Sequence, residues 1–489
     1  MHASLTDTAL TNRARNTLRI ERTLHTNPAP TRLACDGASA LGITLDDLPQ
    51  RAHRALRLNL APGSLTLVTG PSGSGKSTLL SDTRRCFAES VWPERAVVVD
   101  PSALRPGSRP CLDLLAGRHR HPERASRCAL DRLARCGLAD ARAITARAST
   151  LSDGQRERLL LAMAMQRAER FARRSPVLLV VDELGGRVDE ACARSVARCL
   201  RRWLAETHEQ GLNIRAIVST HRAGAIEQLR PGTHIHLSTL GDATVSEEGR
   251  QPPSFDDLYT ITEGDRADLL ALSPLHYRPG APATITKVLR CVDRSSGELA
   301  GVLSVSLPTL NASWRDLAWP GRYRSADPRT DAHRLSKELR CISRVIVEPS
   351  HRSMGVASAL IRAYLASPQT PATEAVASMG RVSPIFERAG MVAQPLPVAP
   401  RHRRLLDAFE ACGIETWRLA QPSTLLPRVE SLEPPARSLL RAELSRWANA
   451  SRATRRLTDA GLPALLPVAC RAITARPVAY THTRPSENP

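Results

Sequence analysis

The sequence of 489 residues predicts an α/β fold with a phosphate-binding loop, followed by a smaller α+β domain and a mostly helical C-terminal region. Two turns support this prediction, because each follows an apolar run and precedes a helical pattern: residues 70–77 and 352–357. The hydrophobic share of 42% is sufficient for packed cores, and a chain of this length corresponds to roughly three domains.

The first turn reads Gly-Pro-Ser-Gly-Ser-Gly-Lys-Ser after the apolar run 65–69. In this context glycines let backbone N–H groups surround phosphates, and the helix N-terminus adds partial positive charge. Lys76 is expected to reach the β- and γ-phosphates, and Ser77 to ligate Mg²⁺. Only three of the 68 basic residues are lysines, so composition alone does not explain this one. The predicted loop contacts to nucleotide are Gly70, Ser72, Gly73, Gly75, Lys76, Ser77 and Thr78.

Polar residues end two further apolar runs, which are predicted strands. Asp182 and Glu183 follow residues 177–181, and His221 comes shortly after residues 214–219. Asp182 is expected to hold Mg²⁺ and Glu183 to polarise an attacking water. Taken alone, the two carboxylates could cap a helix, and His221 could be an ordinary loop histidine.

Residues 151–155 read Leu-Ser-Asp-Gly-Gln, between the loop and the carboxylates. With the motifs in this order, the chain resembles the ABC-type ATPases over about residues 50–240. The resemblance implies ATP and Mg²⁺ as cofactors and a homodimer in which Ser152, Gly154 and Gln155 face the nucleotide of the partner. It also implies that Asp189 is the D-loop aspartate and that His221 contacts the γ-phosphate.

The chain departs from the ABC pattern in three ways. No glutamine lies between the loop and residue 151, which leaves Asp100 or Ser102 as possible substitutes for the usual Mg²⁺ contact. No aromatic residue precedes Phe87, so adenine lacks its usual stacking partner. Asp153 replaces a glycine, which places a carboxylate near the phosphates. Nucleobase selectivity and turnover therefore stay open.

The second turn follows the apolar run 342–347 and contains Arg-x-x-Gly-x-Ala. It resembles motif A of the GNAT acetyltransferases, and residues 383–391 resemble the region that closes that fold. The resemblance covers about residues 270–395, including a hairpin at 285–307, and implies acetyl-CoA as a cofactor. Its implied acetyl-CoA contacts are Val345, Val347, Arg352, Gly355, Val356 and Ala357.

Catalytic groups for acyl transfer are less defined, since the reaction needs a base and often a tyrosine. Glu338, His276, Tyr277 and Glu348 are candidates; His276 and Tyr277 could equally cap and pack a loop. Residues 378–381 could line an acceptor pocket.

The predicted organisation has five parts. Residues 1–50 form a polar, partly disordered leader, and 51–245 the ATPase domain. Residues 246–270 are a linker, 271–400 the GNAT-like domain, and 401–489 a basic helical C-terminal region.

Composition limits the compartment and the partners. Eleven scattered cysteines and no apparent signal sequence favour a cytoplasmic protein. No apolar run is long enough to span a bilayer, so no membrane partner is expected. The net charge of +20 favours contact with RNA or DNA, although dispersed arginines could reflect coding bias.

The leading interpretation is an ATPase coupled in one chain to an N-acyltransferase that acts on nucleic acid. One alternative is an ATP-dependent nucleic-acid-binding or repair protein with a non-catalytic GNAT-like module. Another is a protein or small-molecule acetyltransferase that ATP regulates. The acyl group and the acceptor stay open.

Overall fold

The computed structural model describes residues 17–24, 31–45, 51–89, 95–117, 121–138, 140–238, 242–247, 253–276, 282–312 and 314–484. The chain divides into two compact units. The first comprises residues 1–260, 291–301 and 347–356, and the second comprises residues 261–290, 302–346 and 357–489.

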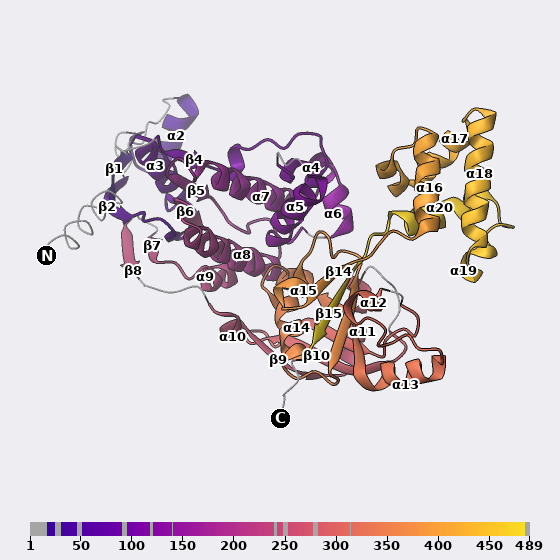
Figure 1. The fold of residues 1–489 in the computed structure, drawn as a ribbon. Coiled ribbons are helices and arrows are strands. Elements are labelled where there is room, and N and C mark those ends of the chain that lie inside the picture. Colours follow the sequence, from indigo (N-terminus) through magenta and orange to yellow (C-terminus); the bar gives the residue numbers. More distant parts are fainter. Residues whose placement is uncertain are drawn as a thin grey trace, which may run out of the picture. The chain divides into compact units, whose positions relative to one another are not determined.

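The first unit contains a six-stranded sheet with the order β4-β5-β6-β3-β7-β8 (Figure 1). Its described strand pairs are parallel except β7 with β8. The predicted strands at 65–69, 177–181 and 214–219 are confirmed to the residue. The strands are β3 (Leu65–Thr69), β4 (Val97–Val99), β5 (Val177–Val181), β6 (Ile214–Ser219), β7 (Thr233–Leu237) and β8 (Ala243–Glu247).

Helices cover both faces of this sheet, as a parallel sheet with buried strands requires. Leu179 of β5 belongs to a core with α7 (Asp153–Phe171) and α8 (Glu190–Glu209), whereas the neighbouring Leu178 belongs to a core with α3 (Lys76–Glu89). The other helices of this unit are α2 (Arg32–Ala40), α4 (Cys111–Leu115), α5 (Pro122–Arg135), α6 (Ala141–Thr145), α9 (Ala223–Leu229) and α10 (Phe255–Leu258).

The predicted leader contributes to the first unit, which corrects the boundary at residue 50. Strand β1 (Thr17–Leu24) pairs antiparallel with β2 (Arg51–Asn59). Leu18 and Ile20 are buried in the same core as α3. Apolar and charged residues alternate here over only a few positions. Such a short alternation within a polar segment does not by itself indicate a strand.

A second sheet has seven strands in the order β14-β15-β13-β12-β11-β10-β9. Strands β12 and β13 run parallel, and β15 is antiparallel to both β13 and β14. Its strands are β9 (Tyr259–Gly264), β10 (Ile285–Asp293), β11 (Leu299–Ser306), β12 (Leu339–Val347), β13 (Ala372–Ala377), β14 (Val392–Pro395) and β15 (Val478–Thr483). The helices associated with this sheet are α11 (Arg266–Leu272), α12 (Arg315–Ala318), α13 (Pro328–Glu338), α14 (Val356–Ala366) and α15 (Ile385–Arg388).

Two predicted boundaries are wrong in this region. The linker 246–270 contains α10, β9 and most of α11, because the polar residues of an edge strand resembled a loop. The C-terminal region is helical only to Thr474, after which β15 enters the sheet between β13 and β14. The last described residues are therefore an internal strand, with Ala479 and Tyr480 buried.

The helices between β14 and β15 form a bundle with a core of their own (Figure 1). They are α16 (Pro400–Ala411), α17 (Pro422–Glu430), α18 (Pro434–Asn449), α19 (Arg452–Arg455) and α20 (Leu462–Thr474). None of the helices in the described ranges combines the length and apolar character needed to cross a bilayer.

Candidate functional site

The first candidate site is the turn between β3 and α3. Strand β3 ends at Thr69 and α3 begins at Lys76. The ammonium group of Lys76 donates hydrogen bonds to the carbonyl oxygens of Gly70, at 2.9 Å, and Pro71, at 2.8 Å. The Lys76 side chain thus folds back from the start of α3 over the turn that precedes it.

Glycine is required by geometry at the start of this turn. Gly70 has φ +146°, and a Cβ there would lie 2.4 Å from the carbonyl oxygen of Leu237. Gly73 and Gly75 also have positive φ, at +78° and +94°. The turn therefore has a backbone conformation that side-chain-bearing residues rarely adopt.

The two predicted carboxylates lie directly after β5, where Ser219 of the adjacent β6 fixes them. The Ser219 hydroxyl donates to Asp182 Oδ1 at 2.5 Å and accepts from the backbone N–H of Glu183 at 2.8 Å. Glu183 has φ +56°, which is uncommon for a residue with a side chain and is typical of functional sites. Both carboxylates are exposed, so they are available to a ligand.

The loop after Glu183 is held from two sides by residues that the sequence did not indicate. The Glu157 carboxylate of α7 accepts from the backbone N–H groups of Gly185 at 3.0 Å and Arg187 at 3.2 Å. The Arg222 guanidinium donates to three carbonyl oxygens of the loop, the shortest contact being 2.9 Å to Val188. Helix α7 and the segment after β6 therefore both determine where this loop lies.

The segment 152–155 begins α7. The Ser152 hydroxyl accepts from the N–H of Gln155 at 3.4 Å, and the Gln155 side chain accepts from the N–H of Ser152 at 3.1 Å, which is a capping box. A Cβ on Gly154 would lie 2.8 Å from the carbonyl oxygen of Arg187. In this chain these residues thus order the start of α7 and its contact with the loop after Glu183.

The remaining predicted residues of the first site lie at the ends of neighbouring elements. Asp189 is the N-cap of α8 and accepts from the N–H of Cys192 at 2.7 Å. His221 is exposed two residues after β6 ends. Asp100, a suggested substitute for the missing glutamine, forms an ion pair with Arg84 at 2.7 Å and accepts from the N–H and hydroxyl of Ser102.

A cavity of about 280 Å³ lies beside these groups. Its lining combines the loop after β4, the first turns of α7 and the loop after β5, including Asp100, Ser102, Glu157, Asp182 and Glu183. The loop after β4 and the loop after β5, which are distant in sequence, therefore share one concave surface in the first unit.

These residues fit a magnesium nucleotide. The turn has a lysine and a helix N-terminus, which suit phosphate. The Ser77 hydroxyl and the Asp182 carboxylate are hard oxygen donors, which Mg²⁺ prefers, and Ser219 fixes the orientation of the carboxylate.

The second candidate site is the turn between β12 and α14. Val345 and Val347 lie at the end of β12, and Val356 and Ala357 begin α14. Ser353 has φ +61° and Gly355 has φ +89°. The Glu348 carboxylate accepts from the N–H of Ser350 at 2.7 Å, so it caps the short helix Pro349–His351.

The predicted acid–base residues are dispersed. Glu338 ends α13 and forms an ion pair with Arg322 at 2.8 Å. His276 follows a short turn, and its backbone N–H donates to the carbonyl oxygen of Ser273 at 3.1 Å. Tyr277 lies outside the described residues. Of residues 378–381, Gly380 accepts from the buried Tyr480 hydroxyl at 3.2 Å.

Comparison with known families matches residues 53–183 to the ABC transporter model. An aliphatic sulfonates import ATP-binding protein of Nocardia farcinica is 34% identical over 42% of this chain and 74% of its own length. An Fe(3+) ions import ATP-binding protein of Yersinia pestis is 26% identical over 39% of this chain and 60% of its own length. The chain thus spans about three fifths of the iron import proteins it matches.

Among solved structures, a dimeric bacterial ABC transporter cassette is similar over 48% of this chain and 99% of its own, with 18% identity and a TM-score of 0.33.

Proposed function

Because this chain belongs to the family of ABC transporter ATP-binding proteins, we propose that its first unit binds and hydrolyses ATP. The observation that carries the proposal is the joint arrangement of Lys76 at the start of α3 and of Asp182 and Glu183, which Ser219 fixes at the end of β5. Enzymes that hydrolyse nucleoside triphosphates use a lysine after a glycine-rich turn to bind phosphates and an aspartate at a strand end to hold Mg²⁺.

Each residue has a distinct role in the proposal. Lys76 exchanges its bonds to the turn carbonyls for bonds to the β- and γ-phosphates. Glu183 accepts a proton from the attacking water, and His221 contacts the γ-phosphate. Ser77 and Asp182 hold Mg²⁺, which neutralises phosphate charge when bound.

The test is phosphate release by the full chain with Mg·ATP. Lys76→Ala should abolish binding of fluorescent ATP, and Glu183→Gln should retain binding but lose turnover. Arg170→Met, an exposed arginine on α7, is the control and should behave as the native chain. Binding of ATP that persists in Lys76→Ala would contradict the proposal.

We also propose that two copies complete the site, with Ser152–Gln155 of each copy facing the nucleotide of the other. Glu183→Gln should trap the dimer in the presence of ATP, which sedimentation can measure. A monomer at saturating ATP would contradict this arrangement. The two similar proteins described above are import ATP-binding proteins. A membrane permease is therefore the alternative to a partner-free homodimer. Co-purification of the trapped dimer with membranes would favour it.

A second candidate function is acyl transfer from CoA, which the second sheet favours. Its strand order, with the parallel pair β12–β13 and the positive-φ turn before α14, supports a GNAT-like fold. The net charge of +20 favours nucleic acid as the acceptor. Incubation of the full chain with acetyl-CoA and pools of RNA, DNA or protein should give a mass shift on one pool. Absence of acetyl-CoA binding by calorimetry would exclude this candidate.

A further inference from the structure

Helix α8 is common to the ATP site and to the turn before α14. Its N-cap is Asp189, which directly follows the loop held by Glu157 and Arg222. Arg198 and Arg202 lie on one face of α8, since residues four apart share a face. They are about 12 and 18 Å along the helix from its first residue. The segments 291–301 and 347–356 belong to the same compact unit as α8.

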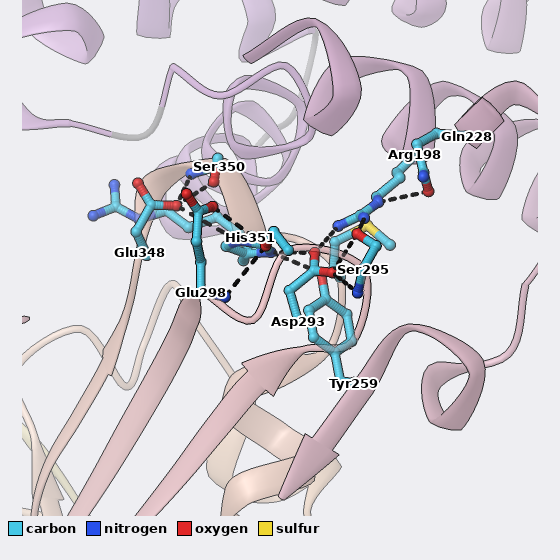
Figure 2. A network of polar contacts seen from close by, with 12 residues as sticks. Arg198, Gln228, Tyr259, Asp293, Ser295, Glu298, Glu348, Ser350 and His351 are labelled. Carbon is cyan, nitrogen blue, oxygen red and sulfur yellow. Dashed lines mark hydrogen bonds and ion pairs between the residues drawn. The ribbon is translucent and has the colours of Figure 1, made fainter. Parts of the chain in front are cut away.

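The first contact is a buried ion pair. Arg198 donates from Nη1 to Asp293 Oδ2 at 2.6 Å and from Nε to Gln228 Oε1 at 2.7 Å (Figure 2). Both charged side chains are 2% exposed. Asp293 also accepts from the N–H and hydroxyl of Ser295. Burial alone would raise the pKa of Asp293, but the bonds from Arg198 and Ser295 lower it to about 2.

The same carboxylate lies beside the turn that precedes α14. Asp293 Oδ2 is 3.8 Å from His351 Nδ1, and the Tyr259 hydroxyl is 3.0 Å from that nitrogen (Figure 2). Burial lowers the pKa of His351, so its imidazole is neutral near pH 7. His351 is thus enclosed by the hairpin 293–299, by Tyr259 and by its own turn.

The second contact is made to the backbone of the turn. Arg202 donates from Nη1 to the carbonyl oxygen of Ser353 at 3.1 Å, and the Cys199 thiol donates to that of Arg352 at 3.7 Å. Burial raises the pKa of Cys199 to about 11, so the thiol keeps its proton. Arg202 also bonds to Glu206, which in turn bonds to Arg135 of α5.

These contacts restrict independent movement of the turn and of α8. Breaking one partner of a buried ion pair leaves an uncompensated charge, which is costly. Displacing the turn would also free carbonyl oxygens that Arg202 and Cys199 satisfy. The turn therefore follows α8, whose N-terminus adjoins the carboxylates of the ATP site.

We propose that α8 couples the ATP site to the turn 348–355, so that ATP binding stabilises the turn and regulates ligand binding there. This inference rests on the proposed ATP site, and its consequence for acyl-CoA rests on the second candidate function. ATP orders the loop before Asp189, and this order reaches the turn through Arg198 and Arg202. By linkage, a ligand of the turn then increases affinity for ATP by the same factor.

Hydrogen exchange on the full-length Glu183→Gln chain tests the coupling. Saturating Mg·ATP should slow exchange of peptides that cover residues 348–356 by about five-fold or more. Exchange that is unchanged or faster, with ATP shown to be bound, overturns the inference. Loss of ATP binding itself would instead overturn the proposed function.

Arg202→Met provides the specific variant, because Arg202 is half-exposed and its replacement keeps the apolar stem. Its ATP affinity should match that of the native chain, while the slowing at residues 348–356 should be lost. Arg170→Met is the matched control and should keep the slowing. A native response in Arg202→Met overturns the role of this contact. The Arg198→Met, Asp293→Leu double variant, which removes both buried charges, should lose the response as well.

Calorimetry with CoA then separates the two levels of the proposal. If CoA binds, saturating Mg·ATP should tighten it by about five-fold, and equal affinity with and without ATP overturns the regulation. If CoA does not bind, the second candidate function fails, while hydrogen exchange still decides the coupling.

Discussion

Two turns of similar local form lie in different surroundings. Residues 70–75 join β3 to α3, and residues 348–355 join β12 to α14. In the first turn, Lys76, the first residue of the helix that follows, binds the turn carbonyls. In the second, an arginine and a thiol from α8 bind them. A strand–turn–helix pattern thus leaves open whether the cation comes from the adjoining helix or from a distant one. The second turn depends on the distant helix α8.

The largest expected effect concerns chemistry at the first turn. Glu183→Gln should lower kcat for ATP hydrolysis by about 10²–10⁴-fold, because the amide cannot accept the proton of water. Steady-state phosphate release measures this effect. Glu227→Gln, an exposed site on α9, is the control and should keep the native rate. Native turnover by Glu183→Gln would remove Glu183 from the reaction.

The next effect concerns backbone conformation. Gly70→Ala should lower the free energy of unfolding by about 3 kcal/mol, since it adds a clash with Leu237 to the cost of positive φ. Gly73→Ala has positive φ but open space around its Cβ, so it should cost about 1 kcal/mol. Urea denaturation of both variants compares them. Equal losses would mean that the approach to Leu237 does not determine the requirement for glycine.

A third effect concerns the anchoring of the second turn and depends on pH. In the folded chain, the bonds from Arg198 and Ser295 lower the pKa of Asp293 to about 2, from an ordinary value of 3.8 in the unfolded chain. Its stabilisation is therefore complete above pH 3.8 and is lost as pH falls through about 2. The loss amounts to about 2 kcal/mol.

Urea denaturation midpoints between pH 5 and 2 measure this loss of stability. They are compared with those of the Arg198→Met, Asp293→Leu double variant. The double variant should show a shallower decline over the same interval. Identical pH profiles would show that the ion pair does not contribute.

The smallest effect concerns the loop that connects β5 to α8. Glu157→Gln should lower kcat by about ten-fold with KM unchanged, because it weakens positioning of the loop after Glu183 without touching nucleotide. Glu157→Asp, which keeps the charge, should recover part of the rate. A change in KM alone would mean that Glu157 acts in binding.

Much of the first unit was predictable from local pattern. Continuous apolar runs defined β3, β5 and β6 to the residue. The order of polar residues after them led to the proposed ATP site, which stays a prediction. Strands β1, β9 and β15 were missed, because short or polar strands lack such a run. Ser219, Glu157 and Arg222 act through contacts between distant segments, and no spacing in the sequence marks them. The same holds for the anchoring of residues 348–355 to α8.

The insertion of the helical bundle between β14 and β15 affects how the second sheet forms. Strand β15 pairs with both β13 and β14, which are separated from it by the bundle. During synthesis, the edges of β13 and β14 therefore stay unpaired until residues 478–483 have left the ribosome. Unpaired strand edges favour aggregation. Because the bundle has a core of its own, it can fold while the sheet still lacks its last strand. The second sheet is therefore completed only after the bundle has been synthesised.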